Sequence, residues 1–428
     1  MESGSTNLEN DKLPTRRTVL GLGLGIGAAL AGCARSSQAD RLTWWAMSQE
    51  GENAPLLIPA FERATGIGVE VQALPWTAAH EKLLTAHAGG SLPDVLMVKN
   101  SWLAELALVG ALAPVPDGSR ALLADQFASA VEAATVGSKA MAVPWVVDSW
   151  VQYYRPDVLA KAGFSAPPTD WAEWTRMARA LKQRHPDRFA VLHLLDWPEP
   201  LMAFAAQQPD PMLKDRNTRG NFTTPGFRAA LAFYKGIYDQ GFSPRVVGSE
   251  VGDTIVAFRR GWTAILPSNA ETVGDLRRRA SWFPAELWRV APTPGPSGPA
   301  SDLANGYSLA VSATTRDPKS AWQLVDYLAR PGTQQSLYRV TGDLPSRPSA
   351  WAVLDTDPSA AVLRGQVDRG RAAPPIAEWE RIVSEVQLVA ERMVRGDFGV
   401  IAATQEMNKR VDRILEKRRW LLDRGLLS

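Results

Sequence analysis

Strand-like and helix-like patterns of apolar residues alternate along residues 41–98. Segments 41–46, 68–74 and 94–98 are short and apolar or alternating, which predicts three strands. Between them, residues 55–64 and 77–88 carry apolar side chains at helical spacing, and a glycine follows each helix. Strands that alternate with helices predict a layered α/β protein with a parallel sheet, whose ligands bind beyond the carboxyl ends of the strands.

The same patterns continue after this region. Asp170 with Glu173 three residues later predicts a helix start, and Trp171 and Trp174 then share a helical face that we expect in the core. The Pro/Gly-rich stretch 291–300 predicts a loop and a crossover. Further strands are expected at 140–144, 261–266 and 307–312, and helices at 225–240, at 319–329 and over most of the chain from 377 onward.

The first forty residues have the pattern of an export signal. Arg16 and Arg17 precede an uncharged stretch, 18–32, that is too short to span a bilayer comfortably. The stretch ends in Leu30-Ala31-Gly32-Cys33, which resembles the bacterial lipobox. We therefore expect 1–32 to be a lipoprotein signal peptide, Cys33 to carry the lipid that anchors the protein to a membrane, and 33–39 to be a tether. The paired arginines fit either a twin-arginine or an ordinary secretory signal.

Composition narrows the functional classes. The 428 residues are 45% hydrophobic, which is enough for a large core in two to three domains. Lysine and arginine number 47 against 45 acidic residues, a balance that argues against a nucleic-acid surface. One cysteine excludes an intramolecular disulfide, and four scattered histidines offer little to a metal, so no cofactor is expected. The 16 tryptophans are a surplus that favours flat faces for a ligand.

The residues best suited to bind a ligand lie at the ends of the predicted strands. The first strand leads into Trp45, Gln49 and Glu50, and the third into Asn100, Ser101 and Trp102. Because the carboxyl ends of parallel strands lie at one edge of a sheet, the sequence predicts a binding site there.

A series of motifs in a fixed order supplies a family likeness. After the lipobox come Phe61-Glu62-Arg63-Ala64-Thr65-Gly66, Leu92-Pro93-Asp94-Val95-Leu96, Val143-Pro144-Trp145 and Thr341-Gly342-Asp343-Leu344-Pro345. This order resembles the extracellular solute-binding proteins of ABC importers, in the carbohydrate-binding branch typified by maltose-binding protein. The resemblance covers residues 40–428.

The resemblance implies an α/β fold of two lobes joined by hinge crossovers, with the ligand held in the cleft between them. The first lobe would be 40–147 plus 300–350, and the second 148–299 plus 351–428. Asp148 would lie at a crossover, although it could instead form a hinge salt bridge, and Asn305-Gly306-Tyr307 could be merely a turn before a strand. The positions implied or kept as ligand contacts are Trp45, Gln49, Glu50, Asn100, Ser101, Trp102, Asp148, Asp196, Trp197, Glu199, Asn269, Asn305, Tyr307, Arg347 and Trp379.

These residue types suit a sugar, because indoles pack on its apolar faces and each buried hydroxyl needs a hydrogen-bonding partner. The expected ligand is a neutral di- or oligosaccharide, with a maltose- or trehalose-type α-glucoside favoured by analogy, delivered to importer permease subunits. Ser268 and Asn269 stand where maltose binders usually place a stacking tryptophan, which weakens the case for a long maltodextrin. Two alternatives stay open: a secreted glycoside hydrolase using Asp148 with Glu50 or Asp196, and a binding protein for glycerol phosphate, through Lys99 or Arg347, or for an amino-sugar.

Overall fold

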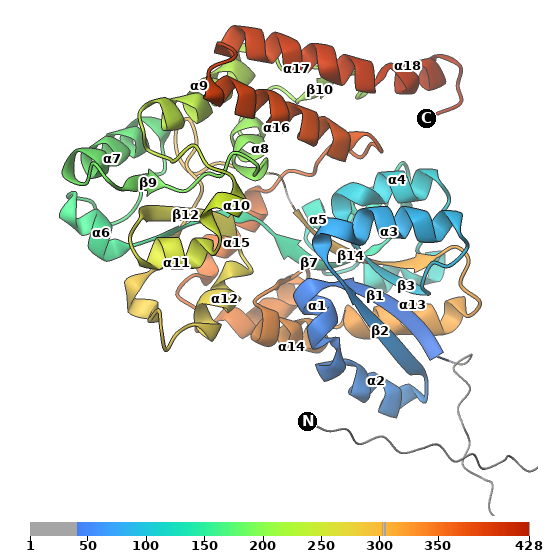
Figure 1. Cartoon of the computed structure of the whole chain (residues 1–428). Coiled ribbons are helices and arrows are strands. Elements are labelled where there is room, and N and C mark those ends of the chain that lie inside the picture. The colour runs from blue at the N-terminus through green and yellow to red at the C-terminus, as the bar shows by residue number, and fades with distance from the viewer. Residues whose placement is uncertain (1–40, 302, 304, 428) are drawn as a thin grey trace, which may run out of the picture. The chain divides into compact units, whose positions relative to one another are not determined.

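The computed structural model describes residues 41–301, 303 and 305–427. The expected signal peptide and the lipidated Cys33 lie outside the described residues. From residue 41 onward the strands form two separate main sheets, each covered by helices (Figure 1). We call the parts built on these sheets the first and the second lobe.

The first lobe contains a seven-stranded sheet in the order β15-β7-β14-β3-β1-β2, with β4 paired to β14. Strand β1 is parallel to β2 and β3, whereas β14 runs antiparallel to β3 and β7. Its strands are β1 (Arg41–Met47), β2 (Gly68–Leu74), β3 (Val95–Lys99), β4 (Leu112–Ala113), β7 (Val143–Asp148), β14 (Asn305–Ser312) and β15 (Leu344–Pro345). Its helices are α1 (Ser48–Asn53), α2 (Ile58–Thr65), α3 (Trp76–Ala88), α4 (Leu103–Leu108), α5 (Ala128–Ala133), α13 (Pro318–Leu328) and α14 (Pro331–Thr341).

The second lobe contains a four-stranded sheet in the order β13-β8-β12-β9. These strands are β8 (Trp150–Tyr154), β9 (Phe189–Val191), β12 (Thr263–Asn269) and β13 (Arg289–Ala291). The helices are α6 (Pro156–Lys161), α7 (Trp171–Arg184), α8 (Glu199–Ala206), α9 (Pro225–Asp239), α10 (Gly248–Val251), α11 (Thr254–Arg259), α12 (Thr272–Arg278), α15 (Ala360–Arg369), α16 (Trp379–Arg395), α17 (Val400–Ile414) and α18 (Glu416–Asp423). Small hairpins are formed by β5 (Thr135–Val136) with β6 (Lys139–Ala140) and by β10 (Leu213–Lys214) with β11 (Arg219–Gly220).

The chain crosses between the two sheets several times. It leaves the first sheet at Asp148 and enters the second at Trp150, and after β13 it returns to the first sheet in β14. After β15 it leads to α16, whose buried face packs in the core of the second lobe. Each lobe has its own apolar cluster, and a third cluster combines residues of both sheets, such as Val147 and Val151. The predicted α/β fold with two lobes and hinge crossovers is confirmed.

Local sequence patterns account for many of the elements. Asp170 caps α7 by accepting a hydrogen bond from the Glu173 backbone N–H at 2.8 Å, and Trp174 is buried as expected. Gly66 ends α2 in the left-handed conformation, with φ of 74°. Two expectations differ from the structure. The strand expected at 140–144 begins only at Val143, and the first sheet is mixed because β14 enters it from the opposite direction after the crossover.

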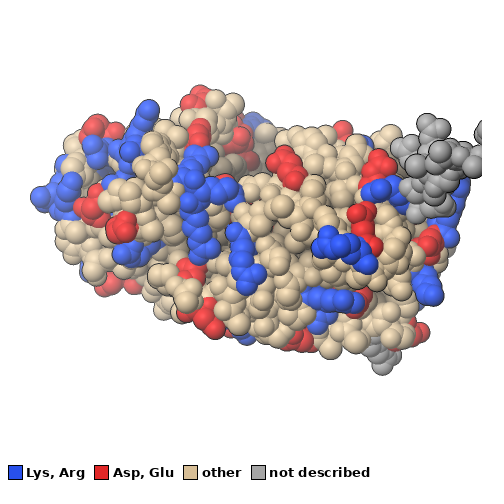
Figure 2. Space-filling view, turned by 90° about the horizontal axis from the view of Figure 1, so that it is seen from below, with Lys and Arg blue, Asp and Glu red and all other residues tan. Residues whose placement is uncertain are grey.

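Charged side chains of both signs lie interspersed on the face shown in Figure 2. Within the described part of the chain, none of the helices combines the length and the apolar character needed to cross a bilayer.

Candidate ligand-binding site

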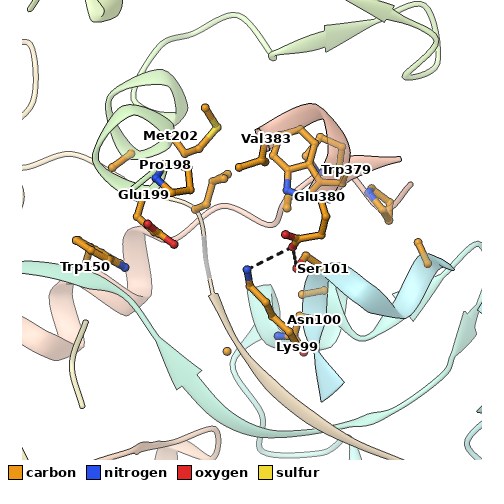
Figure 3. A pocket seen from close by; sticks show the side chains of 18 of the residues that line it. Lys99, Asn100, Ser101, Trp150, Pro198, Glu199, Met202, Trp379, Glu380 and Val383 are labelled. Atoms are coloured by element: carbon orange, nitrogen blue, oxygen red, sulfur yellow. Dashed lines mark hydrogen bonds and ion pairs between the residues drawn. The ribbon is translucent and has the colours of Figure 1, made fainter. Parts of the chain in front are cut away.

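A cavity lies where the end of β3 meets the first turns of α8 and α16 (Figure 3). Residues of the first lobe form one wall, and residues of the second lobe form the other. The first wall includes Lys99, Asn100, Ser101, Ala104, Ala133, Val136 and Gly306, and the second includes Trp150, Pro198, Glu199, Met202, Pro374, Trp379, Glu380 and Val383. Apolar surface and hydrogen-bonding groups are therefore combined in one cavity, as is usual for small-molecule sites.

The antiparallel β14 brings its own start to the ends of β3 and β7. In the strand register Tyr307 lies opposite Lys99, and Asn305 lies opposite Asp148. Gly306 has φ of 142°, and a Cβ there would lie 2.3 Å from the carbonyl oxygen of Val146. Only glycine fits this close approach, so the wall of the cavity depends on it.

Two indoles line the cavity. Trp150 at the start of β8 lies edge-on to Trp197, with 5.6 Å between ring centroids. Trp379 begins α16 and is 3% exposed, because much of its ring packs in the core of the second lobe. Trp150 was not among the residues predicted from sequence, although it lies only two residues after the predicted crossover residue Asp148.

Two other tryptophans that were predicted as ligand contacts pack mainly against side chains of the protein itself. Trp102 is 6% exposed and is stacked on His80, with 4.9 Å between ring centroids. Trp45 packs against the first-lobe core, and Lys82 Nζ lies 4.5 Å from its ring centroid. Neither residue belongs to the lining of the cavity.

The polar groups of the cavity come from both lobes. Lys99 Nζ lies 3.3 Å from Glu380 Oε1, and Ser101 Oγ donates a hydrogen bond to the same oxygen. Asn100 Oδ1 accepts a hydrogen bond from Ser308 Oγ at 2.7 Å. Burial raises the pKa of the Glu199 carboxyl, and the positive charge of Lys99 acts in the opposite direction. Lys99 had been considered only as a phosphate ligand, and Glu380, beside the predicted Trp379, was missed.

Asp148 lies beside the cavity, at the crossover expected from the sequence. It lines a small adjoining cavity together with Asn100 and Ala133. Its Oδ1 accepts a hydrogen bond from the Ala270 backbone N–H at 3.0 Å, and burial raises its pKa to about 7. The ion pairs formed among the described residues do not include Asp148, so the hinge salt bridge considered as an alternative has no support there.

A group of carboxylates lies deeper between the lobes. Glu50 is 1% exposed and Asp343 is 3% exposed, and one oxygen of each has no hydrogen-bond partner among the described residues. Burial, with smaller contributions from neighbouring negative charges, raises the pKa of both carboxyls. Gln49 joins the lobes here, because its Nε2 donates to Glu271 Oε1 at 3.0 Å and its Oε1 accepts from Arg278 at 2.7 Å.

Several predicted positions have contacts elsewhere. The guanidinium of Arg347 donates to the backbone carbonyls of Leu122, Ala124 and Ala329 and is absent from the described cavity lining. The Asp196 carboxylate accepts hydrogen bonds from the Gly248 N–H. Asn269 bonds Glu271 and Thr272, and Tyr307 packs beside Trp76, with 4.7 Å between ring centroids. Among the described residues, no group of three His, Cys, Asp or Glu side chains is arranged to hold a metal.

Two sheets, repeated crossovers and a cavity walled from both sides define a two-lobed binding protein. Residues 45–335 match the model of the family described as bacterial extracellular solute-binding protein. The chain belongs to this family.

The similarity to individual proteins covers between half and nine-tenths of the chain. The structure of the sugar-binding protein MalE from the phytopathogen Xanthomonas citri is 39% identical, with a TM-score of 0.84 over 90% of this chain and 99% of that one. A protein of Streptomyces antibioticus described as an uncharacterized lipoprotein is 27% identical over 71% of this chain and 70% of its own. A "Probable ABC transporter-binding protein" of Deinococcus radiodurans is 26% identical over 50% of this chain and 52% of its own.

Proposed function

We propose that the chain is the sugar-binding component of an ABC importer and binds a neutral di- or oligosaccharide between its lobes. The observation that carries the proposal is the cavity itself, in which Trp150 and Trp379 stand beside Asn100, Ser101 and Glu199. Indoles offer apolar faces to sugar rings, and the polar groups can pair with hydroxyls that would otherwise lose hydrogen bonds on burial. The likeness to a sugar-binding protein at 39% identity adds support.

An α-glucoside of the maltose or trehalose type is the first ligand to test. The charges near the cavity argue for a neutral ligand over a phosphorylated one. Lys99 already contacts the Glu380 carboxylate, and Arg347 is engaged with backbone carbonyls. A bound phosphate would therefore have to compete with these contacts and approach Glu199 and Glu380.

Location and partners follow the same proposal. The description of the family as extracellular supports a location outside the cytoplasm. The lipobox motif supports an anchor on Cys33, and the Streptomyces antibioticus relative described as a lipoprotein is consistent with it. In this arrangement closure around sugar would be the signal that the permease recognises.

Isothermal titration calorimetry against maltose, trehalose, maltotriose, lactose, glucosamine and glycerol 3-phosphate tests the proposal. We expect binding heat with at least one neutral sugar and none with glycerol 3-phosphate. Glu199→Gln should weaken binding about tenfold or more, because hydrogen bonds to charged groups contribute roughly 1.5–3 kcal/mol. Glu173→Gln is the matched control, since Glu173 occupies the first turn of α7 on the exposed surface.

Folded protein that gives no heat with any neutral sugar would refute the proposal. Release of product from a labelled oligosaccharide would instead support a glycoside hydrolase.

A further inference from the structure

Lys99 and Glu380 make direct contact across the cavity from opposite lobes. Lys99 is the last residue of β3, and Figure 3 shows its ammonium group directed toward the Glu380 carboxylate. The Lys99 Nζ to Glu380 Oε1 distance is 3.3 Å, and Ser101 Oγ donates to the same oxygen. One carboxylate oxygen of the second lobe is thus held by two residues of the first.

A second carboxylate of the second lobe lies close to the same ammonium group. Glu199 is the first residue of α8, lines the cavity, and interacts electrostatically with both Lys99 and Glu380. Among the described residues that line the cavity, Lys99 is the only cation. Its charge therefore lies between two acidic helix starts that would repel each other without it.

Opening the lobes would separate these groups. Glu380 belongs to α16, whose buried residues pack in the second-lobe core, whereas Lys99 belongs to the first sheet. The contact can persist only while the two lobes are close together. The side chains of Lys99 and Glu380 are each 31% exposed, so water reaches both charges and the contribution of the pair is modest.

We propose that Lys99 and Glu380 form an electrostatic latch that favours the closed arrangement of the lobes before any ligand is bound. A ligand that binds the closed form has a lower apparent affinity when that form is less populated. Lys99 and Glu380 are in this sense positioning residues for closure. The part of the inference that concerns ligand affinity rests on the proposed function, whereas the part that concerns ligand-free closure does not.

Charge reversal and exchange test the latch. The variants are Lys99→Glu, Glu380→Lys, the double exchange and the milder Glu380→Gln, each checked for folding by its thermal unfolding curve. Small-angle X-ray scattering of the ligand-free proteins measures the radius of gyration. We expect a larger radius for both single reversals and a return toward the wild-type value in the double exchange. Glu385→Gln is the control, because Glu385 lies on the same helix but pairs with Arg410 within the second lobe.

Sugar affinity provides the second measurement. For Glu380→Gln we expect a dissociation constant about two- to fivefold higher than wild type, the effect of a partly exposed ion pair. Single reversals with an unchanged ligand-free radius, or an exchange that restores nothing, would overturn the latch. A radius that responds as expected in a protein that binds none of the sugars would leave the latch standing and overturn the proposed function.

Discussion

Trp102 lies inside the first lobe, between His80 and Trp76, with its ring mostly removed from solvent. Its position after β3 suggests a sugar-stacking face, but in the structure its ring packs against other aromatic side chains of the first lobe. Trp102→Ala should therefore act mainly on folding. We expect the free energy of unfolding, measured with urea, to fall by about 3–5 kcal/mol, the usual effect of truncating a buried tryptophan.

Trp420→Ala is the control for this substitution, because Trp420 is 48% exposed. It should change the free energy of unfolding by less than about 1 kcal/mol. If Trp102→Ala left the urea midpoint unchanged and weakened sugar binding, Trp102 would instead be a ligand-contacting residue.

Glu50 is the residue from which we expect the clearest pH effect. Burial raises the pKa of its carboxyl, and the charges of Asp343, Glu271 and Asp148 add to this. The folded protein therefore keeps a proton that the unfolded chain loses above its ordinary pKa of about 4.3. Since the unfolded state then binds fewer protons, stability falls as the pH rises from 5 to 8.

Glu50→Gln cannot titrate and should flatten this dependence. Urea unfolding at pH 5 and pH 8 should give similar stabilities for wild type and variant at pH 5, and a more stable variant at pH 8. The difference can grow by at most about 1.4 kcal/mol per pH unit. Glu286 is exposed, so Glu286→Gln should keep the wild-type dependence of unfolding free energy on pH. If wild type and Glu50→Gln showed the same dependence, the pH effect could not be assigned to Glu50.

The close approach of α12 to the end of α14 joins segments that lie far apart in the sequence. A Cβ on Gly274 would lie 2.1 Å from the carbonyl oxygen of Thr341, and Arg278 of the same helix donates to the Val340 carbonyl at 2.9 Å. A side chain at position 274 must push one helix away from the other.

Gly274→Ala should accordingly lower the free energy of unfolding by about 1–3 kcal/mol, as overpacking usually does. Gly332→Ala is a matched control in α14, because a Cβ there meets nothing within 4 Å. Alanine at that position should leave stability equal or raise it by about 0.5–1 kcal/mol. Urea unfolding curves that coincide for the two variants would show that the helices can move apart without cost.

Helix starts also explain where the acidic groups of the cavity come from. Glu199 and Glu380 both lie in the first turn of a helix, where the backbone N–H groups are unpaired and a negative charge is favoured. The position stabilises each helix and at the same time directs a carboxylate toward the opposite lobe. The identity of the opposing residue is then decided by packing of the lobes.

The apolar cores of the two lobes are linked by a third apolar cluster at the crossovers. Separate cores let each lobe stay rigid while the segments between them bend, which is the usual basis of hinge closure. Beside this apolar cluster, several contacts that cross between the lobes are polar, among them those of Lys99 and Ser101 with Glu380, and of Gln49 with Glu271 and Arg278. Polar contacts of this kind can be exchanged for water when the lobes open.

Much of the candidate site could be predicted in outline from the sequence. Asn100, Ser101, Glu199 and Trp379 were predicted and line the cavity, and Asp148 lies directly beside it. Trp102 was assigned to the ligand because its place at a strand end was visible, whereas its stacking on His80 was not. Glu380 was missed because its partner Ser101 lies 279 residues away in the chain.

Local sequence patterns specify the order of strands and helices, the cap of α7 and the glycine that ends α2, because each depends on neighbours within a few residues. Which indoles reach the cavity depends on long-range packing, and so do the antiparallel entry of β14 and the contact of Lys99 with Glu380. Those outcomes depend on how two separately packed lobes come together, and burial and charge pairing across such an interface leave no periodic signal along the chain.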